Sequence, residues 1–264
     1  MDLTNCNLGS DGLVIIKNCF SESKIVGLRE SLDRATKKYN ELQCSKGLDS
    51  LVNGTLHHPL LFDDAFLGLL DMPESLHHMV EGWFKGKYIL NSYGGVTNVN
   101  KTSSYVQAIH RDTRFYCGEY NLFLNLLLPL DDFTIENGAT YILNKKWSTP
   151  TCPDKEFFLE HADRLLVNAG DAVLFDSNLW HKAGNNTTSK ARRCVTMTFS
   201  RPWIKPQFDF CAAVAMRMEV PTHLRQILGY FSRVPASANE WLLPANERFY
   251  RQGQDKVASD DTGI

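Results

Sequence analysis

Short apolar runs separated by turn residues fill the middle of the chain, and this pattern predicts a β-rich core. Gly94-Gly95, Asn137-Gly138 and Ala169-Gly170-Asp171 are examples of the turn signals. The predicted strands cover residues 88–93, 105–110, 121–130, 139–143, 172–176 and 193–200. Because most of these strands follow one another without a helix between them, the pattern favours an antiparallel sandwich or barrel over a Rossmann sheet.

The periodicity is different near the two ends of the chain. A β-branched run at residues 13–17 predicts a strand, and Ser21 then offers a helix cap before apolar residues at helical spacing up to about residue 39. Further helices are predicted over residues 73–84, 154–166 and 221–230, and the polar tail, residues 252–264, is predicted to be loosely ordered. We therefore expect one domain over residues 1–264, with a β core at about 88–203 and helical additions at both ends.

Composition and charge narrow the classes of function. A formal net charge of -2 argues against nucleic-acid binding, because a phosphate backbone selects a basic face. The longest apolar runs are far too short to span a bilayer, so no membrane segment is expected. The seven cysteines are scattered, and the N-terminus carries no secretory signal pattern, which favours a cytoplasmic protein with reduced thiols. The sequence does not indicate the oligomeric state.

Candidate chemistry begins with His110-Arg111-Asp112 at the end of an apolar run. On an extended chain, residues two apart point to the same face, so His110 and Asp112 could bind one ion together. Alone, a His-x-Asp pair is more often a solvated turn than a metal site. A second pair, His161 and Asp163, lies where the apolar spacing predicts a helix, and we reject it as the metal pair.

His181 is the candidate for a third metal ligand. It ends an apolar strand that follows the turn at Gly170, although a histidine there could instead cap the strand edge beside Trp180. Non-haem Fe(II) oxygenases use two imidazoles and one carboxylate on one face of the iron. His110, Asp112 and His181 could supply that set.

Two adjacent arginines differ in the face that they occupy on the next predicted strand. Arg192 alternates in phase with the small residues Cys194, Thr196 and Thr198, whereas Arg193 alternates with the apolar residues of the opposite face. A guanidinium on the small, polar face can hold a dicarboxylate in bidentate fashion. Arg193 fits the interpretation of a surface arginine better.

The chain resembles the phytanoyl-CoA dioxygenase family of Fe(II)/2-oxoglutarate oxygenases. The segments that carry the resemblance follow one another in the family's order over roughly residues 11–205: "DGLVIIKNCFSESKIVGLRESLDR", "HRD", "LPLDDFTIENGATYIL", "AGDAVLFDSNLWHKAGNN" and "ARRCVTMTFSRPW". The resemblance implies a mainly β protein with flanking helices, a double-stranded β-helix of the cupin-like jelly-roll type.

The resemblance also implies roles for particular residues. His110, Asp112 and His181 would bind one Fe(II), and Arg192 would pair with the distal carboxylate of 2-oxoglutarate. Two asparagines match approximately the places where polar side chains assist in the family, namely Asn91 and Asn125. O2 would be the second co-substrate, and ascorbate is a candidate reductant.

The implied reaction oxidises an unactivated C–H bond of a small molecule while 2-oxoglutarate is decarboxylated to succinate. Since Asp112 keeps the carboxylate that related halogenases lack, hydroxylation is favoured, with desaturation or ring formation as alternatives. A non-catalytic ligand-binding β-helix protein and a zinc or manganese cupin-like enzyme are competing interpretations. The complete set of four residues argues against the first, and Arg192 argues against the second.

The substrate is left open. Residues 144–147 read Asn-Lys-Lys-Trp where the family often has Pro-Gly-Ser-His, near the mouth of the active site in its members. The chain has no evident phosphate-binding loop, which favours a small specialised metabolite over a CoA thioester. The candidate pocket residues are Tyr93, Arg111, Arg114, Phe115 and Trp203.

Overall fold

Two antiparallel sheets form the centre of the protein. The computed structural model describes residues 3, 6–49, 53–100, 104–113, 115–216, 218–244 and 247. The larger sheet has the strand order β1-β7-β4-β9-β3-β2, and the smaller sheet has the order β6-β5-β8. The bounds of the strands are Leu13–Ile16 (β1), Thr55–His57 (β2), Ile89–Asn98 (β3), Phe123–Pro129 (β4), Tyr141–Ile142 (β5), Asp163–Arg164 (β6), Ala172–Asp176 (β7), His181–Lys182 (β8) and Arg192–Ser200 (β9). The predicted antiparallel β core is thereby confirmed.

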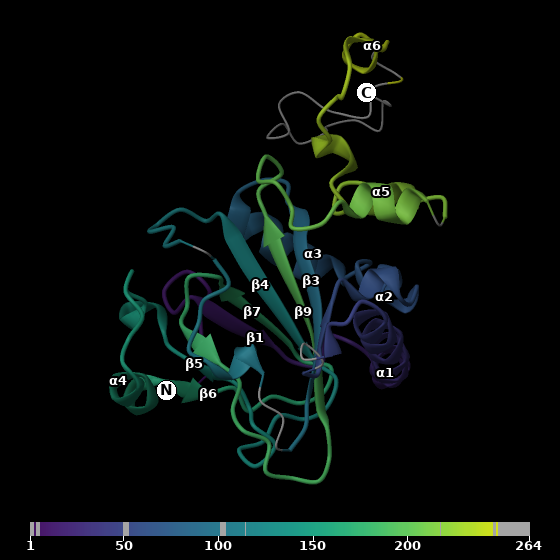
Figure 1. Ribbon diagram of the computed structural model, residues 1–264. Coiled ribbons are helices and arrows are strands. Elements are labelled where there is room, and N and C mark those ends of the chain that lie inside the picture. Colours follow the sequence, from purple (N-terminus) through teal and green to yellow (C-terminus); the bar gives the residue numbers. More distant parts are fainter. Residues whose placement is uncertain are drawn as a thin grey trace.

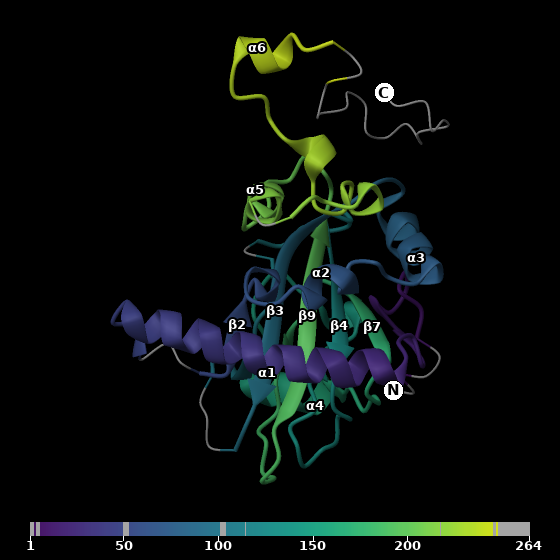
Figure 2. The same cartoon turned by 90° about the vertical axis from the view of Figure 1, so that its right-hand side faces the viewer.

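Three N-terminal helices cover the outer face of the larger sheet. They are α1 (Glu22–Ser45), α2 (Ala65–Leu69) and α3 (Glu74–Phe84), and Figure 2 shows α1 lying across the strands. Ser21 caps α1 by accepting a hydrogen bond from the backbone N–H of Lys24, as predicted. The apolar stripe of α1 packs against the outward side chains of β9 in one core, which includes Leu28, Leu32 and Val195. Because α1 covers one face of β9, the side chains of the other face lie on the inner side of the sheet.

The other helical elements lie around the ends of the sheets. They are η3 (Pro59–Leu61), η4 (Tyr105–Gln107), η5 (Lys145–Trp147), α4 (Lys155–His161), α5 (Phe210–Ala215), η6 (Thr222–Leu224), η7 (Tyr230–Ser232) and α6 (Ala238–Trp241). In Figure 1, α5 and α6 lie beyond one end of the larger sheet, and α4 lies beside the small sheet. No helix in the described part of the chain is both long enough and apolar enough to cross a membrane.

The prediction of a strand over residues 105–110 is wrong. Residues Tyr105–Gln107 form a 3-10 helix, because the backbone N–H of Gln107 donates to the carbonyl of Ser104 and the side-chain oxygen of Gln107 accepts from the backbone N–H of Ser104 over 3.3 Å. Only His110 pairs as a strand residue, in an isolated bridge with His181. The face that His110 presents is therefore set by this bridge and not by alternation along a strand.

Two predicted helices are also shorter than expected or absent. The helix predicted over 154–166 ends at His161, because Asp163 and Arg164 form β6 and pair with β5. In place of the helix predicted over 221–230, the chain makes the 3-10 turn η6 and then reverses at Gly229, whose φ of 85° lies in the left-handed region. The predicted loose tail, residues 252–264, lies outside the described residues.

Candidate active site

A cavity of about 440 Å³ lies on the inner side of the larger sheet. Residues of β3, β4 and β9 form part of its wall, and residues from the smaller sheet and from η4 complete it. Five of the six predicted site residues line this one cavity: His110, Asp112, Asn125, His181 and Arg192. The fold thus brings together residues that are up to 82 positions apart in the sequence.

His110, Asp112 and His181 form a cluster that could hold a metal ion. One ligand atom from each lies within 4.8 Å of the other two. Nε2 of His110 is 3.8 Å from one oxygen of Asp112, and Nε2 of His181 is 3.7 Å from the other. The two histidines are held side by side by a pair of backbone hydrogen bonds, 3.0 and 2.8 Å long, between their peptide groups.

Backbone contacts orient both imidazoles in the same way. Nδ1 of His110 lies 2.9 Å from the carbonyl oxygen of Ala108, and Nδ1 of His181 lies 3.0 Å from that of Leu179. A carbonyl can only accept, so each Nδ1 carries the proton and each Nε2 keeps its lone pair for a metal. Burial lowers the pKa of His181, although the carboxylate of Asp112 acts in the opposite direction. A neutral imidazole is the form that binds a metal.

Asn125 holds the carboxylate of the cluster. Its side-chain N–H donates to Asp112 over 2.5 Å, and its side-chain oxygen accepts from the hydroxyl of Thr198 over 2.8 Å. Thr198 and Asn125 are directly paired residues of β9 and β4. The amide is thereby fixed in the orientation that donates to Asp112, which is a typical arrangement behind a metal ligand.

Arg192 is a buried cation that has no counter-ion among the described residues. Its side chain is 1% exposed, and its guanidinium carbon lies 4.1 Å from the centre of the Phe133 ring. Nε and Nη1 are shut off from solvent and have no hydrogen-bond partner among the described residues. Burial lowers the pKa of the guanidinium, the direction expected when a charge is desolvated. Such a group calls for an anionic partner, because an unpaired buried charge is costly.

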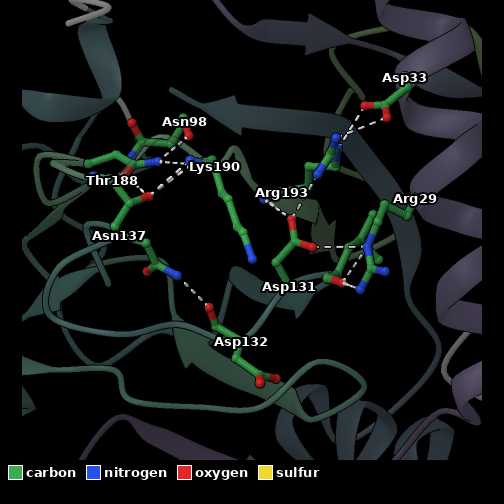
Figure 3. A network of polar contacts seen from close by, with 11 residues as sticks. Arg29, Asp33, Asn98, Asp131, Asp132, Asn137, Thr188, Lys190 and Arg193 are labelled. Atoms are coloured by element: carbon green, nitrogen blue, oxygen red, sulfur yellow. Dashed lines mark hydrogen bonds and ion pairs between the residues drawn. The ribbon is translucent and has the colours of Figure 1, made fainter. Parts of the chain in front are cut away.

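Arg193 points to the opposite face and is fully paired. Its guanidinium contacts Asp33 of α1 over 2.7 and 3.0 Å and Asp131 over 3.2 Å. Arg29 of α1 contacts the other oxygen of Asp131 over 2.9 Å, and Figure 3 shows these four side chains as one network. The parity argument is therefore correct: Arg192 lines the cavity, and Arg193 fastens β9 to α1.

The structure does not bring Asn91 to the cavity. Its side-chain N–H group donates to the hydroxyl of Ser200 and to the carbonyl of Lys205, over 3.1 and 3.3 Å. The ladder between β3 and β9 is irregular between Leu90 and Ser92, so Asn91 has no partner in the register. This bulge changes the alternation, and Ser92 is the residue of β3 that lies opposite Thr198 and lines the cavity.

The other pocket residues considered in the sequence are distributed differently. Tyr93 lines the cavity, whereas Phe115 and Trp203 do not and are 59% and 72% exposed. Arg114 lies outside the described residues. Arg111 lines the cavity, and its guanidinium contacts Trp180 and two backbone carbonyls.

Arg111 clamps the two ligand-bearing segments together. Its guanidinium lies 3.9 Å from the centre of the Trp180 ring, and it donates to the carbonyls of Thr149 and Pro150. The indole N–H of Trp180 donates to the same Thr149 carbonyl over 2.9 Å. Residue 111 stands between His110 and Asp112, and residue 180 precedes His181. A cation–π contact therefore links the residues adjacent to all three candidate ligands.

The chain belongs to the phytanoyl-CoA dioxygenase (PhyH) family, whose model matches residues 8–194. An uncharacterised protein of Mycobacterium tuberculosis is 27% identical over 96% of this chain and 94% of its own length. The dioxygenase FUM3 of Gibberella moniliformis is 22% identical over 86% of this chain and 82% of its own. An iron/alpha-ketoglutarate-dependent dioxygenase of Penicillium thymicola, penM, is 33% identical over a shorter stretch, 38% of this chain and 34% of that protein.

Solved structures with the same fold include enzymes of this chemical class. The non-haem monooxygenase ThoJ, solved as a nickel complex, superposes with a TM-score of 0.58 and 18% identity over 79% of this chain and 80% of its own. The epimerase SnoN of nogalamycin biosynthesis gives 0.57 and 15% over 75% and 83%. The predicted jelly-roll fold is confirmed. The predicted enzyme class, an Fe(II)- and 2-oxoglutarate-dependent dioxygenase, is confirmed as well.

Proposed function

We propose that His110, Asp112 and His181 hold one Fe(II), that Arg192 holds 2-oxoglutarate, and that the enzyme hydroxylates an unactivated C–H bond of a small molecule. One observation carries this proposal: a buried guanidinium, whose Nε and Nη1 have no partner in the described part of the chain, lines the same cavity as a two-histidine, one-carboxylate cluster. A metal cluster alone would fit a zinc or manganese enzyme equally well. The additional buried cation calls for a dicarboxylate.

The donor set fits ferrous iron. Two Nε2 atoms and one carboxylate, gathered on one side of the cavity, match the facial arrangement that leaves coordination positions for other ligands. The side chain of Asp112 is 34% exposed and that of His181 is 10% exposed, so the cluster is open on one side and backed by protein on the other. Asn125 holds one oxygen of Asp112 and keeps the carboxylate from turning away.

Arg192 fits the far carboxylate of 2-oxoglutarate. A planar guanidinium donates two parallel N–H groups to a carboxylate, and in a desolvated place such a pair is stronger than in water. Its neighbours on the cavity face of β9 are Cys194, Thr196 and Thr198, whose small side chains leave room along the strand. The keto-acid end of the molecule would then extend toward the candidate metal ligands.

In the proposed mechanism the protein supplies binding, orientation and exclusion of water. Bound iron supplies the oxidising chemistry, using O2 and the electrons released when 2-oxoglutarate loses CO2. Asp112 occupies a position that a halide would need, which favours hydroxylation over halogenation. The Nδ1–H groups of His110 and His181 donate to backbone carbonyls, so both rings would offer Nε2 to the metal. Ascorbate as a reductant remains a prediction.

The proposed substrate is a small specialised metabolite. Support comes from the size of the cavity, about 440 Å³, which suits a small molecule once 2-oxoglutarate is bound. We further infer a cytoplasmic enzyme, because all seven cysteines are free in the structure.

Succinate release tests the proposal. Purified protein with Fe(II), 2-oxoglutarate and O2 should form succinate slowly. A true substrate from a metabolite panel should accelerate succinate formation, and mass spectrometry should show that the substrate gains one oxygen atom. The control is Arg192→Ala, which should need far more 2-oxoglutarate. Turnover that proceeds with Zn(II) in place of Fe(II), or without 2-oxoglutarate, would contradict the proposal.

A further inference from the structure

A histidine pair at the end of β2 shares the cavity with the candidate metal ligands. His57 is the last residue of β2, and His58 follows it directly before η3. Both line the cavity, and neither belongs to the metal cluster. The ring of His57 stacks on Tyr105 of η4, with 6.3 Å between ring centres and an interplanar angle of 10°. The pair therefore forms a wall of imidazole and phenol groups in a cavity that must also receive a substrate.

The backbone of His58 is held in an uncommon conformation. Its φ of 54° and ψ of 58° lie in the left-handed region, which is disfavoured for a residue with a Cβ. Two hydrogen bonds hold it there: its N–H donates to the carbonyl of Tyr93 over 2.7 Å, and its carbonyl accepts from Leu61 over 2.9 Å. Strained residues that the surrounding structure holds in place cluster at functional sites. The backbone conformation sets the direction in which the side chain of His58 leaves the chain.

The ring of His58 packs against aromatic side chains. Its centre lies 4.7 Å from that of Phe208 and 5.6 Å from that of Phe210. Nδ1 is shut off from solvent and has no hydrogen-bond partner among the described residues. Burial, with a smaller contribution from His57, lowers the pKa of His58 to about 4. The ring is therefore neutral at physiological pH.

The enclosure also fixes where the single proton of the neutral ring lies. Unpaired buried donors are rarer in proteins than unpaired acceptors, and their burial costs more than a hydrogen bond gains. Nδ1 accordingly carries a lone pair, and Nε2 carries the proton. Because His58 lines the cavity, Nε2–H is the donor that its ring would offer to a ligand there.

We propose that His58 is a substrate-positioning residue, which donates a hydrogen bond from Nε2–H to an uncharged carbonyl or hydroxyl oxygen of the substrate. This inference rests on the proposed function, since it concerns the same cavity. An acidic group against the His58 ring would meet a neutral donor among aromatic rings, which offsets the loss of its hydration less than a cation would. The substrate class is therefore a neutral, oxygen-bearing small molecule, and not a compound that presents a carboxylate or phosphate to this wall.

The first experiment needs no substrate. The protein is labelled with 15N-histidine, loaded with Zn(II) to avoid the line broadening caused by Fe(II), and titrated with pH. We expect His58 to stay neutral at pH 6 with its proton on Nε2. A charged His58 at pH 6, or a neutral ring with its proton on Nδ1, would overturn the proposal.

The second experiment compares His58→Leu with His58→Gln. Both side chains carry the same backbone strain, but only glutamine places an N–H donor near the position of Nε2. With the panel compound that most accelerates succinate release, His58→Leu should raise KM about tenfold, the scale of one lost hydrogen bond to a buried group. It should also form more succinate per product. His58→Gln should stay within about threefold of the wild-type KM, and both variants should keep the wild-type KM for 2-oxoglutarate.

The outcomes separate this inference from the proposed function. Equal behaviour of the two variants would overturn the role of His58 while leaving the iron and 2-oxoglutarate assignments intact. A stimulating compound that is anionic at the end facing this wall would overturn the substrate class. Absence of 2-oxoglutarate-dependent succinate release in the wild type would count against the proposed function, and the pH titration would still decide the state of His58.

Discussion

Each face of β9 carries one arginine, and the two arginines have different surroundings. On the inner face Arg192 is 1% exposed and has no partner for Nε or Nη1 among the described residues, and Cys194, Thr196 and Thr198 leave space beside it. On the outer face Arg193 is bound by two carboxylates, and the residues in phase with it pack under α1. The guanidinium of Arg192 is thus available to a ligand, whereas that of Arg193 is paired with carboxylates of the protein.

The comparison of Arg192 with Arg193 shows how one strand can hold a buried charge for a ligand and still be stable. Leaving Arg192 unpaired costs stability, because a buried charge without a partner is unfavourable. The apolar core under α1 and the ion pairs of Arg193 supply stability elsewhere on the same strand. Substitutions on the inner face should therefore reduce function, whereas those on the outer face should reduce stability.

The largest effect is expected at the candidate metal ligands. His181→Ala should abolish turnover while the protein keeps its fold, because two remaining ligands cannot hold a catalytic iron. The loss should exceed about a hundredfold, since even residues that only orient a metal ligand cost 10–100-fold. Iron content and succinate release measure it. His161→Ala, in the His-x-Asp pair outside the cavity, is the control and should retain iron. A His181→Ala enzyme with stoichiometric iron and wild-type rate would refute the assignment.

The next effect separates the two arginines. Arg192→Ala should raise the KM for 2-oxoglutarate about ten- to a hundredfold, because a charge-assisted, bidentate contact is lost. Arg193→Ala should change the same KM by less than about threefold. Initial rates at varied 2-oxoglutarate concentration measure both. A larger effect at Arg193 would reverse the assignment of the two faces.

A substitution on the outer face of β9 should lower the thermal stability of the protein. Arg193→Ala removes contacts with Asp33 and Asp131, so Tm should fall by roughly 2–4 °C, the scale of about 1 kcal/mol in a chain of this size. Because the ion pairs are partly exposed, the difference from wild type should shrink as salt is added. Thermal unfolding at low and high ionic strength measures this. A difference that does not change with salt would show that packing, and not charge, accounts for the role of Arg193.

The strong periodic signals predicted the sheet well. The apolar runs that became β4, β7 and β9, and the capped helix α1, lie close to where the sequence places them, because both faces of those strands and the stripe of α1 are dictated by burial. The parity of Arg192 and Arg193 could be predicted for the same reason. A regular strand of nine residues preserves its alternation from end to end.

The predictions of a strand over residues 105–110 and of Asn91 as a site residue were wrong, because local hydrogen bonds and a register shift changed the backbone there. The turn that Gln107 closes on Ser104 made a 3-10 helix of a segment with a β-like sequence, although His110 still reached its place through a bridge to His181. The bulge at Asn91 changed which side chains of β3 face the cavity. The pattern of apolar residues in this segment does not indicate a bulge. The left-handed backbone of His58 was equally hidden, although the His-His-Pro sequence could have signalled a break before a helix.

The smallest effect is expected behind Asp112, where Thr198 orients Asn125. Thr198→Val keeps the shape of the side chain and removes only the hydroxyl that donates to Asn125. Without that bond the amide can rotate, and its N–H group spends less time on Asp112. Because Asp112 itself is untouched, Fe(II) affinity should fall by less than about tenfold, below the 10–100-fold typical of a residue that touches a metal ligand directly. Asn125→Ala removes that direct contact and should fall in the larger range. Fe(II) titration of both variants measures the order, and Thr198→Ser, which keeps the hydroxyl, should restore wild-type affinity. A Thr198→Val loss as large as that of Asn125→Ala would mean that Thr198 acts on the metal site by a route other than Asn125.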